Sequence, residues 1–246
     1  MSKEIVKTES QNTGLVVAPD YGADAGAGIA DLDPDVLSLP YITVLQALSP
    51  QCNEGESAFI QEARPGMILN SVTLDLFDGK TGLIIQPVSI RQVYAEWVSR
   101  DEGGGKVTEH LPESECVREA QAAATEWNDL RMPNGHLLER TFYMTVLTYA
   151  NLDDQNPTPA IISMTSTKIA PFRKFVTRLS ALQGGRVPLF ANRVRLTTVL
   201  EKNSAGQPYY NFAYAPAVGK SFLESLLPPD SPFFLSAKKF RDSQVK

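Results

Sequence analysis

The sequence has few of the residues that build metal sites, disulfide frameworks and many active sites. It contains 2 cysteines and 2 histidines in 246 residues. Two thiols, Cys52 and Cys116, are too few for a disulfide framework or a thiolate zinc site, so we expect both to be reduced. His110 and His136 lie beside turn signals and are expected to be exposed. Neither belongs to a metal-binding motif, and no bound metal is predicted.

Long apolar runs and catalytic motifs are also missing. No apolar stretch approaches the length of a membrane span, and the first residues lack the apolar core of a signal peptide. The sequence therefore predicts a cytoplasmic protein without a membrane partner. Phosphate-binding GxxxxGK[ST] loops, a GxGxxG after a strand and GxSxG nucleophile elbows are absent. We expect a protein that is not an enzyme and has no cofactor.

Charge is distributed unevenly along a chain whose formal net charge is -5. Residues 1–37 carry 7 acids and 2 bases, a net of -5, and residues 38–160 carry 17 acids and 8 bases, a net of -9. Residues 161–246 carry 4 acids and 13 bases, a net of +9. An acidic total therefore does not exclude a polyanionic partner, because the local field decides binding. Folding could also interleave these segments and leave a mixed surface.

The hydrophobic pattern predicts a mostly β or α+β fold, an OB-like β-barrel with additional helices. Residues 83–98 form a long predicted strand, in which Pro87 indicates an edge position or a bulge. Residues 113–130 read as a helix and residues 137–149 as a strand. We expect three parts, which are a flexible acidic N-terminal arm (1–37), an OB-like core that binds nucleic acid (38–217), and a basic helical C-terminal tail (218–246).

The basic third of the sequence is the candidate binding surface. Residues 171–182 form a predicted amphipathic helix that Gly184 ends. Residues 193–201 and 208–215 form a predicted hairpin, in which a basic strand lies beside an aromatic one. Such a surface contacts phosphates and stacks bases, although either face of a strand can belong to the core. The candidate contacts are Arg91, Tyr94, Lys168, Arg173, Lys174, Arg178, Arg186, Arg193, Arg195, Tyr209, Tyr210, Phe212 and Tyr214.

The chain resembles the single-stranded DNA-binding proteins of bacteriophages, a divergent OB-fold family. The resemblance is a diffuse pattern carried by residues 39–50, 65–70, 83–97, 188–191, 193–199 and 209–212. It implies protection of single-stranded DNA in replication, recombination or repair, without a cofactor, in the host cytoplasm. The resemblance is also compatible with a homo-oligomer. Many of these proteins end in an acidic tail that recruits replication or recombination proteins, whereas this chain ends in basic residues and carries its acidic segment at the N-terminus.

Three other interpretations fit the same residues. A phage structural or assembly protein would also be rich in β-structure and lack catalytic residues. Asp153 and Asp154 could bind a divalent cation in a nuclease, although no third carboxylate or helper lysine lies beside them. A protein-interaction module could use the acidic regions against a basic partner.

The acidic N-terminal segment generates a first prediction. If it takes the role of the acidic tail, it competes with DNA for the basic surface. Deletion of residues 1–36 is then expected to tighten binding to single-stranded DNA, measured by fluorescence anisotropy at low salt. An unchanged affinity would count against this role.

Overall fold

Two long antiparallel strands, β4 (Leu83–Trp97) and β7 (Leu137–Tyr149), pair along their whole length. Both are rich in β-branched and aromatic residues, which suit a pleated and buried surface. The computed structural model describes residues 39–126 and 129–244, which lie in one unit, Leu39–Lys246. The acidic arm predicted for residues 1–37 lies outside the described residues.

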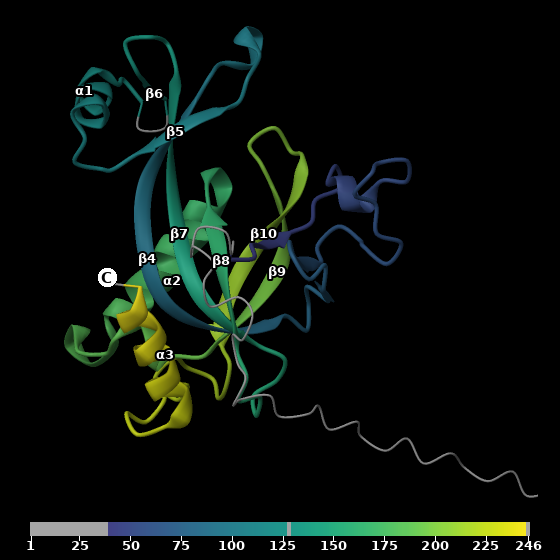
Figure 1. Cartoon of the computed structure of the whole chain (residues 1–246), viewed down its shortest axis with the longest axis vertical. Helices are drawn as coiled ribbons and strands as arrows, with labels where there is room; N and C mark the ends of the chain where they lie inside the picture. Colours follow the sequence, from purple (N-terminus) through teal and green to yellow (C-terminus); the bar gives the residue numbers. More distant parts are fainter. Residues whose placement is uncertain (1–38, 127–128, 245–246) are drawn as a thin grey trace, which may run out of the picture. The chain divides into compact units, whose positions relative to one another are not determined.

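In the described part of the chain, β4 and β7 belong to a seven-stranded sheet. The other strands of this sheet are β5 (Lys106–His110), β6 (Leu130–Arg131), β8 (Thr158–Met164), β9 (Val194–Lys202) and β10 (Pro208–Pro216). The β9–β10 hairpin pairs with the start of β4, and β5 pairs with its end. On the other side, β7 pairs with β6 at its start and with β8 further along. Figure 1 shows β5, β6 and α1 at one end of the β4–β7 pair.

A second, three-stranded sheet lies beside the first. It consists of β1 (Ile42–Val44), β2 (Ile68–Asn70) and β3 (Leu76–Phe77). One parallel bridge joins Tyr41 to Ile161 of β8, and the Gln46 amide bonds both main-chain groups of Tyr210 in β10, each at 2.8 Å. Ile42 and Val44 of β1 and Ile68 of β2 also pack with residues of the large sheet in the main hydrophobic core. The two sheets therefore share a core, and both are open.

The prediction of a mostly β fold with helices is confirmed, but the predicted barrel does not close. Residues 70–74 form a turn, in which the Asn70 side chain accepts the amides of Val72 and Thr73. Leu74 has φ 60, which breaks an extended strand. The short strands on either side of this turn leave too few ladder bonds to close a barrel.

Of the two alternatives predicted for Pro87, an edge position or a bulge, the structure has the bulge. The register of β4 against β7 shifts between Pro87 and Ser89, where the proline has no amide hydrogen to donate. Before the bulge Leu83 and Ile85 face the main core, and after it Ile90 does. The shift therefore exchanges the faces on which odd and even residues lie.

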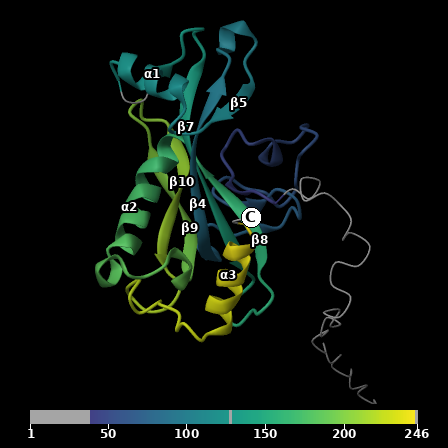
Figure 2. The ribbon, with the colours of Figure 1, turned by 60° about the vertical axis from the view of Figure 1, so that its left-hand side comes forward.

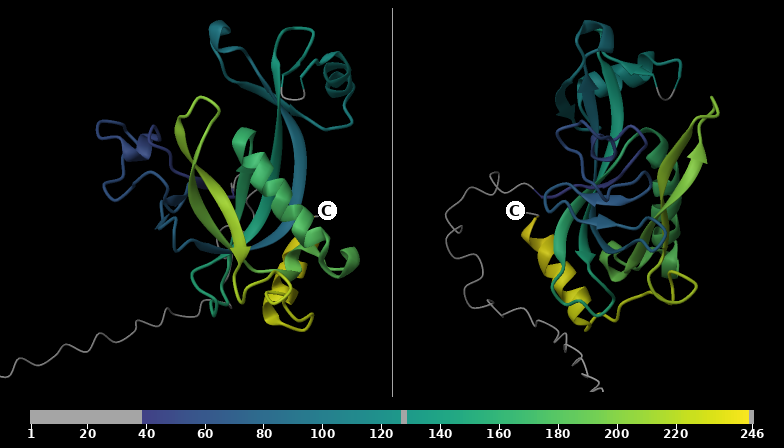
Figure 3. Two further views of the ribbon diagram at one scale, coloured as in Figure 1. Left: turned by 180° about the vertical axis from the view of Figure 1, so that it is seen from behind. Right: turned by 90° about the vertical axis from the view of Figure 1, so that its right-hand side faces the viewer.

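Three α-helices cover the strands in the described residues, α1 (Glu115–Ala123), α2 (Ile169–Ser180) and α3 (Pro232–Ser243). Phe172, Phe175 and Leu179 of α2 enter the main core, whereas Phe233 and Ala237 of α3 pack with a separate cluster that contains Ile84. Figures 2 and 3 show α2 and α3 on opposite sides of the β4–β7 pair. Within residues 218–244, α3 packs on this cluster through Phe233 and Ala237.

Short 3-10 turns connect these elements. They are η3 (Pro50–Cys52), η4 (Arg100–Glu102), η5 (Ser166–Lys168), η6 (Leu182–Gly185) and η7 (Leu189–Ala191). The helix predicted over residues 113–130 ends at Ala123, and Leu130 begins β6. Leu130 instead packs with Tyr94, Val117 and Leu138 in a small core beneath α1. No helix in residues 39–126 and 129–244 has the length and apolar character to cross a bilayer.

A single carboxylate fastens the strands around α1. The Glu96 side chain in β4 is 7% exposed and accepts Nε2 of His110 at 2.7 Å and Nδ1 of His136 at 2.6 Å. His110 ends β5 and His136 precedes β7, so the cluster ties both segments to β4. Both histidines are half-buried rather than exposed as predicted. Hydrogen bonds from His110 and then His136 lower the pKa of Glu96 below its usual value.

We expect Glu96→Gln to lower the free energy of unfolding by about 2 kcal/mol near pH 7, because a charged hydrogen-bond acceptor is lost. A lowered folded-state pKa stabilises the protein fully above the unfolded value of about 4.3, and this gain disappears as the pH falls through the folded value. Urea unfolding of both proteins from pH 7 to pH 3 should therefore show the difference shrinking in acid. The exposed Glu119→Gln in α1 is the matched control, and a pH-independent difference would contradict the assignment.

Candidate nucleic-acid interface

The outer face of α2 carries an uncompensated row of positive charge. Phe172 and Phe175 turn inward, which leaves Arg173, Lys174 and Arg178 exposed on the opposite side. Within residues 39–126 and 129–244, none of these three cations forms an ion pair. Lys174 and Arg178 are four residues apart and repel each other mildly, so an anion between them would be stabilising.

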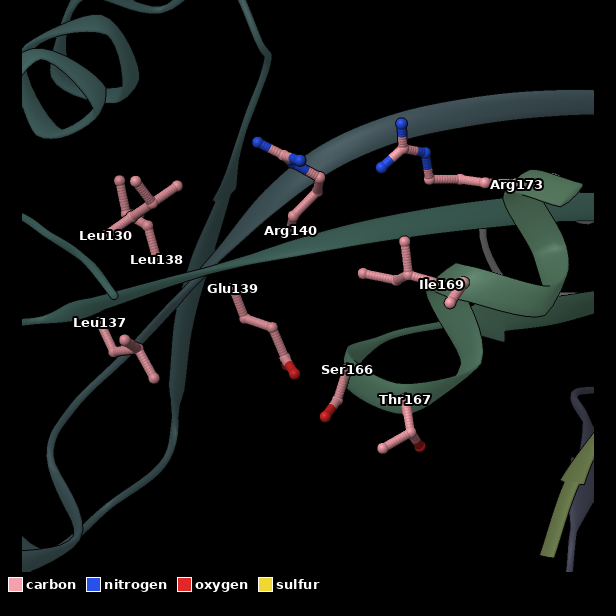
Figure 4. Close-up of a pocket in the computed structure, with 10 residues that line it drawn as sticks. Leu130, Leu137, Leu138, Glu139, Arg140, Ser166, Thr167, Ile169 and Arg173 are labelled. Carbon is pink, nitrogen blue, oxygen red and sulfur yellow. The ribbon is translucent and has the colours of Figure 1, made fainter. Parts of the chain in front are cut away.

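The N-terminal end of α2 borders a cleft of about 570 Å³. Its lining comes from β6, the start of β7, η5 and α2, and consists of Leu130, Leu137, Leu138, Glu139, Arg140, Ser166, Thr167, Ile169, Ala170 and Arg173. Figure 4 shows Arg140 and Arg173 together on one side, with the Glu139 carboxylate and the Ser166 hydroxyl on the other. Arg173 belongs to both the cleft and the exposed row, so the two features are continuous.

Arg140 is held in place by a buried tyrosine. Its Nε donates to the Tyr94 hydroxyl at 3.1 Å, and its guanidinium lies 5.6 Å from the centroid of that ring. Gln121 of α1 also donates to this hydroxyl at 2.7 Å. Tyr94 is 2% exposed and cannot stack on a base as predicted. It orients Arg140 instead.

Glu139, which lines the cleft, and Lys168 are both half-buried. Burial raises the pKa of Glu139, and the nearby Lys168 opposes this shift. Burial lowers the pKa of Lys168, whose ammonium lies 5.8 Å from the centroid of the Phe212 ring. Lys168 is therefore turned inward and is not an exposed phosphate contact as the sequence predicted.

Most aromatic residues of the hairpin belong to the core. Phe212 is 1% exposed, and the Tyr214 ring stacks on Phe175 of α2 with centroids 4.3 Å apart. Burial raises the pKa of the Tyr214 hydroxyl. These two rings cannot stack on a base, because α2 covers the face of β10 on which they lie. The prediction of base stacking is corrected for both.

Tyr209 and Tyr210 are half-buried and differ in their contacts. Tyr210 packs against Gly66, where an added Cβ would lie 2.5 Å from the ring. Tyr209 lies on the other face of β10, and its hydroxyl donates to Glu201 at 2.8 Å. That hydrogen bond raises the pKa of Tyr209. Tyr209 is thus the one predicted aromatic of this hairpin that the core does not hold.

The three remaining arginines predicted on strands are already engaged. Arg193 is 9% exposed and lies 4.2 Å from the centroid of the Phe233 ring, which fixes α3 to the sheet. Arg195 is half-buried and donates to the Thr81 carbonyl at 3.0 Å. Arg91 is exposed but pairs with Glu109 at 3.0 Å. The sequence predicted that Arg193 contacts phosphate directly. The structure gives it a structural role instead.

Arg186 follows η6 and is exposed, close in sequence to the end of α2. It forms no ion pair within the described part of the chain. The structure thus leaves Arg173, Lys174, Arg178 and Arg186 as the predicted cations that are exposed and form no ion pair in the described residues. It adds Arg140, a half-buried cation that lines the cleft. Sequence reasoning missed Arg140 because the strand pattern does not reveal which face of β7 opens onto a cleft.

One carboxylate of the pair that a nuclease would use, Asp154, is engaged in loop structure. Asp154 accepts the amides of Ala150 and Asn156, each at 2.9 Å. Within the described residues no group of three or more His, Cys, Asp or Glu side chains is placed to hold a metal ion. The geometry therefore gives the nuclease interpretation no support.

A family model for the Pam3 phage gp34-like protein matches residues 8–246. The chain belongs to this family. No curated protein and no solved structure matches the chain. The match supports the predicted phage origin, and the family description carries no biochemical activity.

Proposed function

We propose that this phage protein binds and protects single-stranded DNA without strong sequence preference, in replication, recombination or repair. The observation that carries the proposal is the exposed cation row of α2, continuous with the cleft through Arg173. A polyanion gains from contact with such a row because bound phosphates release condensed counterions. The same contacts would make affinity fall steeply with salt.

The cleft favours a single strand over a duplex. Its apolar walls, formed by residues such as Leu137 and Ile169, could contact a base only after that base leaves a stack. Its volume of about 570 Å³ falls in the range of small-ligand sites. Guanidinium groups at the border could hold the adjoining phosphates. Phe212 and Tyr214 are held in the core and Tyr210 packs on Gly66. The proposal therefore depends on this cleft and on charge rather than on an exposed stacking surface.

The charge contribution is tested by a matched pair of double variants. Lys174→Gln with Arg178→Gln removes two charges from α2, whereas Lys238→Gln with Lys239→Gln removes two exposed charges from α3. We expect the α2 variant to bind labelled oligo-dT about 10-fold more weakly at low salt, with a slope of log K against log salt smaller by about 1.4. The α3 variant should change much less.

Anisotropy titrations across a salt series, with duplex DNA as competitor, provide the measurement. Equal losses in both double variants would show that binding is a property of net charge and not of α2. If the unmodified protein does not bind at low salt, the proposal is wrong and a structural or assembly role becomes the leading interpretation.

The cleft is tested by filling it. Ala170→Phe places a ring inside the lining, and Ala181→Phe places the same ring at the exposed far end of α2. We expect Ala170→Phe to weaken oligo-dT binding about 10-fold, equivalent to loss of one base contact of about 1–3 kcal/mol. Binding of duplex DNA should be unaffected. If the two variants bind oligo-dT equally well, no base enters the cleft.

A further inference from the structure

Cys116 lies against an imidazole whose other nitrogen is fixed by a buried carboxylate. Its Sγ is 3.4 Å from Nδ1 of His110, and Nε2 of His110 is 2.7 Å from Glu96. An ionised carboxylate only accepts hydrogen bonds, so Nε2 of a neutral His110 must carry the hydrogen. Nδ1 is then an unprotonated acceptor that faces the thiol.

This arrangement is that of an activated nucleophile. Nδ1 can accept the thiol proton, and Glu96 stabilises the imidazolium that results. Cys116 is also the second residue of the nine-residue helix α1, where the helix dipole favours a negative charge. The nucleophile, base and orienting acid come from α1, β5 and β4, so the fold itself assembles them.

We propose that Cys116 is a reactive thiol that exchanges with low-molecular-weight disulfides and becomes a mixed disulfide. This inference does not depend on nucleic-acid binding. In the exchange, Sγ attacks one sulfur of the disulfide, a new S–S bond forms and the original S–S bond breaks. The leaving thiolate takes the proton held by His110, so one thiol is oxidised and one is released in reduced form.

The product should persist because the second cysteine is in a different part of the structure. Cys52 packs with Leu45, Ala63 and Leu69, whereas Cys116 packs with the cluster around Tyr94. An internal disulfide therefore cannot displace the added group without rearrangement of the core. This geometry favours a stable modification over repeated turnover.

Cys52 is also an internal control. It is half-buried like Cys116, but burial raises the pKa of its thiol despite the nearby Arg64. The experiment treats the full-length folded protein with oxidised glutathione at pH 7 and follows each cysteine by peptide mass mapping. We expect Cys116 to be modified at least about 10-fold faster than Cys52, and the two rates to converge in urea, where the His110 contact is lost.

Two variants separate activation from simple exposure. His110→Asn removes the proton acceptor, whereas His136→Asn removes a hydrogen bond to the same carboxylate without a contact to Cys116. Modification of Cys116 should slow about 10-fold in His110→Asn and much less in His136→Asn, with circular dichroism confirming that both are folded. If either variant unfolds, the comparison of folded and urea-treated wild type still decides. Equal rates for the two cysteines in the folded protein, or an unchanged rate in folded His110→Asn, would overturn the proposal.

Discussion

The paired strands β4 and β7 are the constraint on which the other elements depend. Each of the other strands of the large sheet hydrogen-bonds to one of these two or, as β10 does, to β9 beside them. Residues 83–88 of β4 are buried on both faces, with α3 and the main core on opposite sides. The shift between Pro87 and Ser89 then redirects the second half of β4, so that Tyr94 and Glu96 face α1, β6 and the two histidines.

The same packing decides which residues are left for binding. One face of the large sheet is apolar and has to be shielded from water. Helix α2 shields it by placing Phe172 and Phe175 over β7 and β10. Two aromatic residues of the hairpin lie in this packing, since Tyr214 stacks on Phe175 and Phe212 belongs to the same core. The outer face of α2 is therefore polar, and the charged residues on it are all cations, beside the exposed Thr177 and Ser180. The exposed surface of α2 therefore carries positive charge, whereas Phe172 and Phe175 are buried against the sheet.

The sequence predicted the strands, turns and helices better than it predicted which face of each element is buried. Residues 137–149, the bulge at Pro87 and the β9–β10 hairpin were all predictable, because periodicity and turn residues are local signals. Whether the sheet closes into a barrel could not be predicted, because closure depends on β1, β2 and β3, which are only two or three residues long. The inward position of Phe212 also depends on α2, which lies far away in the sequence. His110 and His136 carried no motif, and only the fold brings both to Glu96.

Glu139 explains how the cleft could orient a nucleotide. Its carboxylate, on the opposite side of the cleft from Arg140 and Arg173, would repel a phosphate that entered the cleft, but it can accept a hydrogen bond from the edge of a base. Burial raises its pKa, so the group also becomes a donor more readily than an exposed glutamate. Under the proposed function, the base therefore enters toward Glu139 and Ser166, and the phosphates stay outside with Arg173 and the cation row of α2. The strand would then follow the helix, which makes its contacts with the sugar–phosphate backbone independent of sequence.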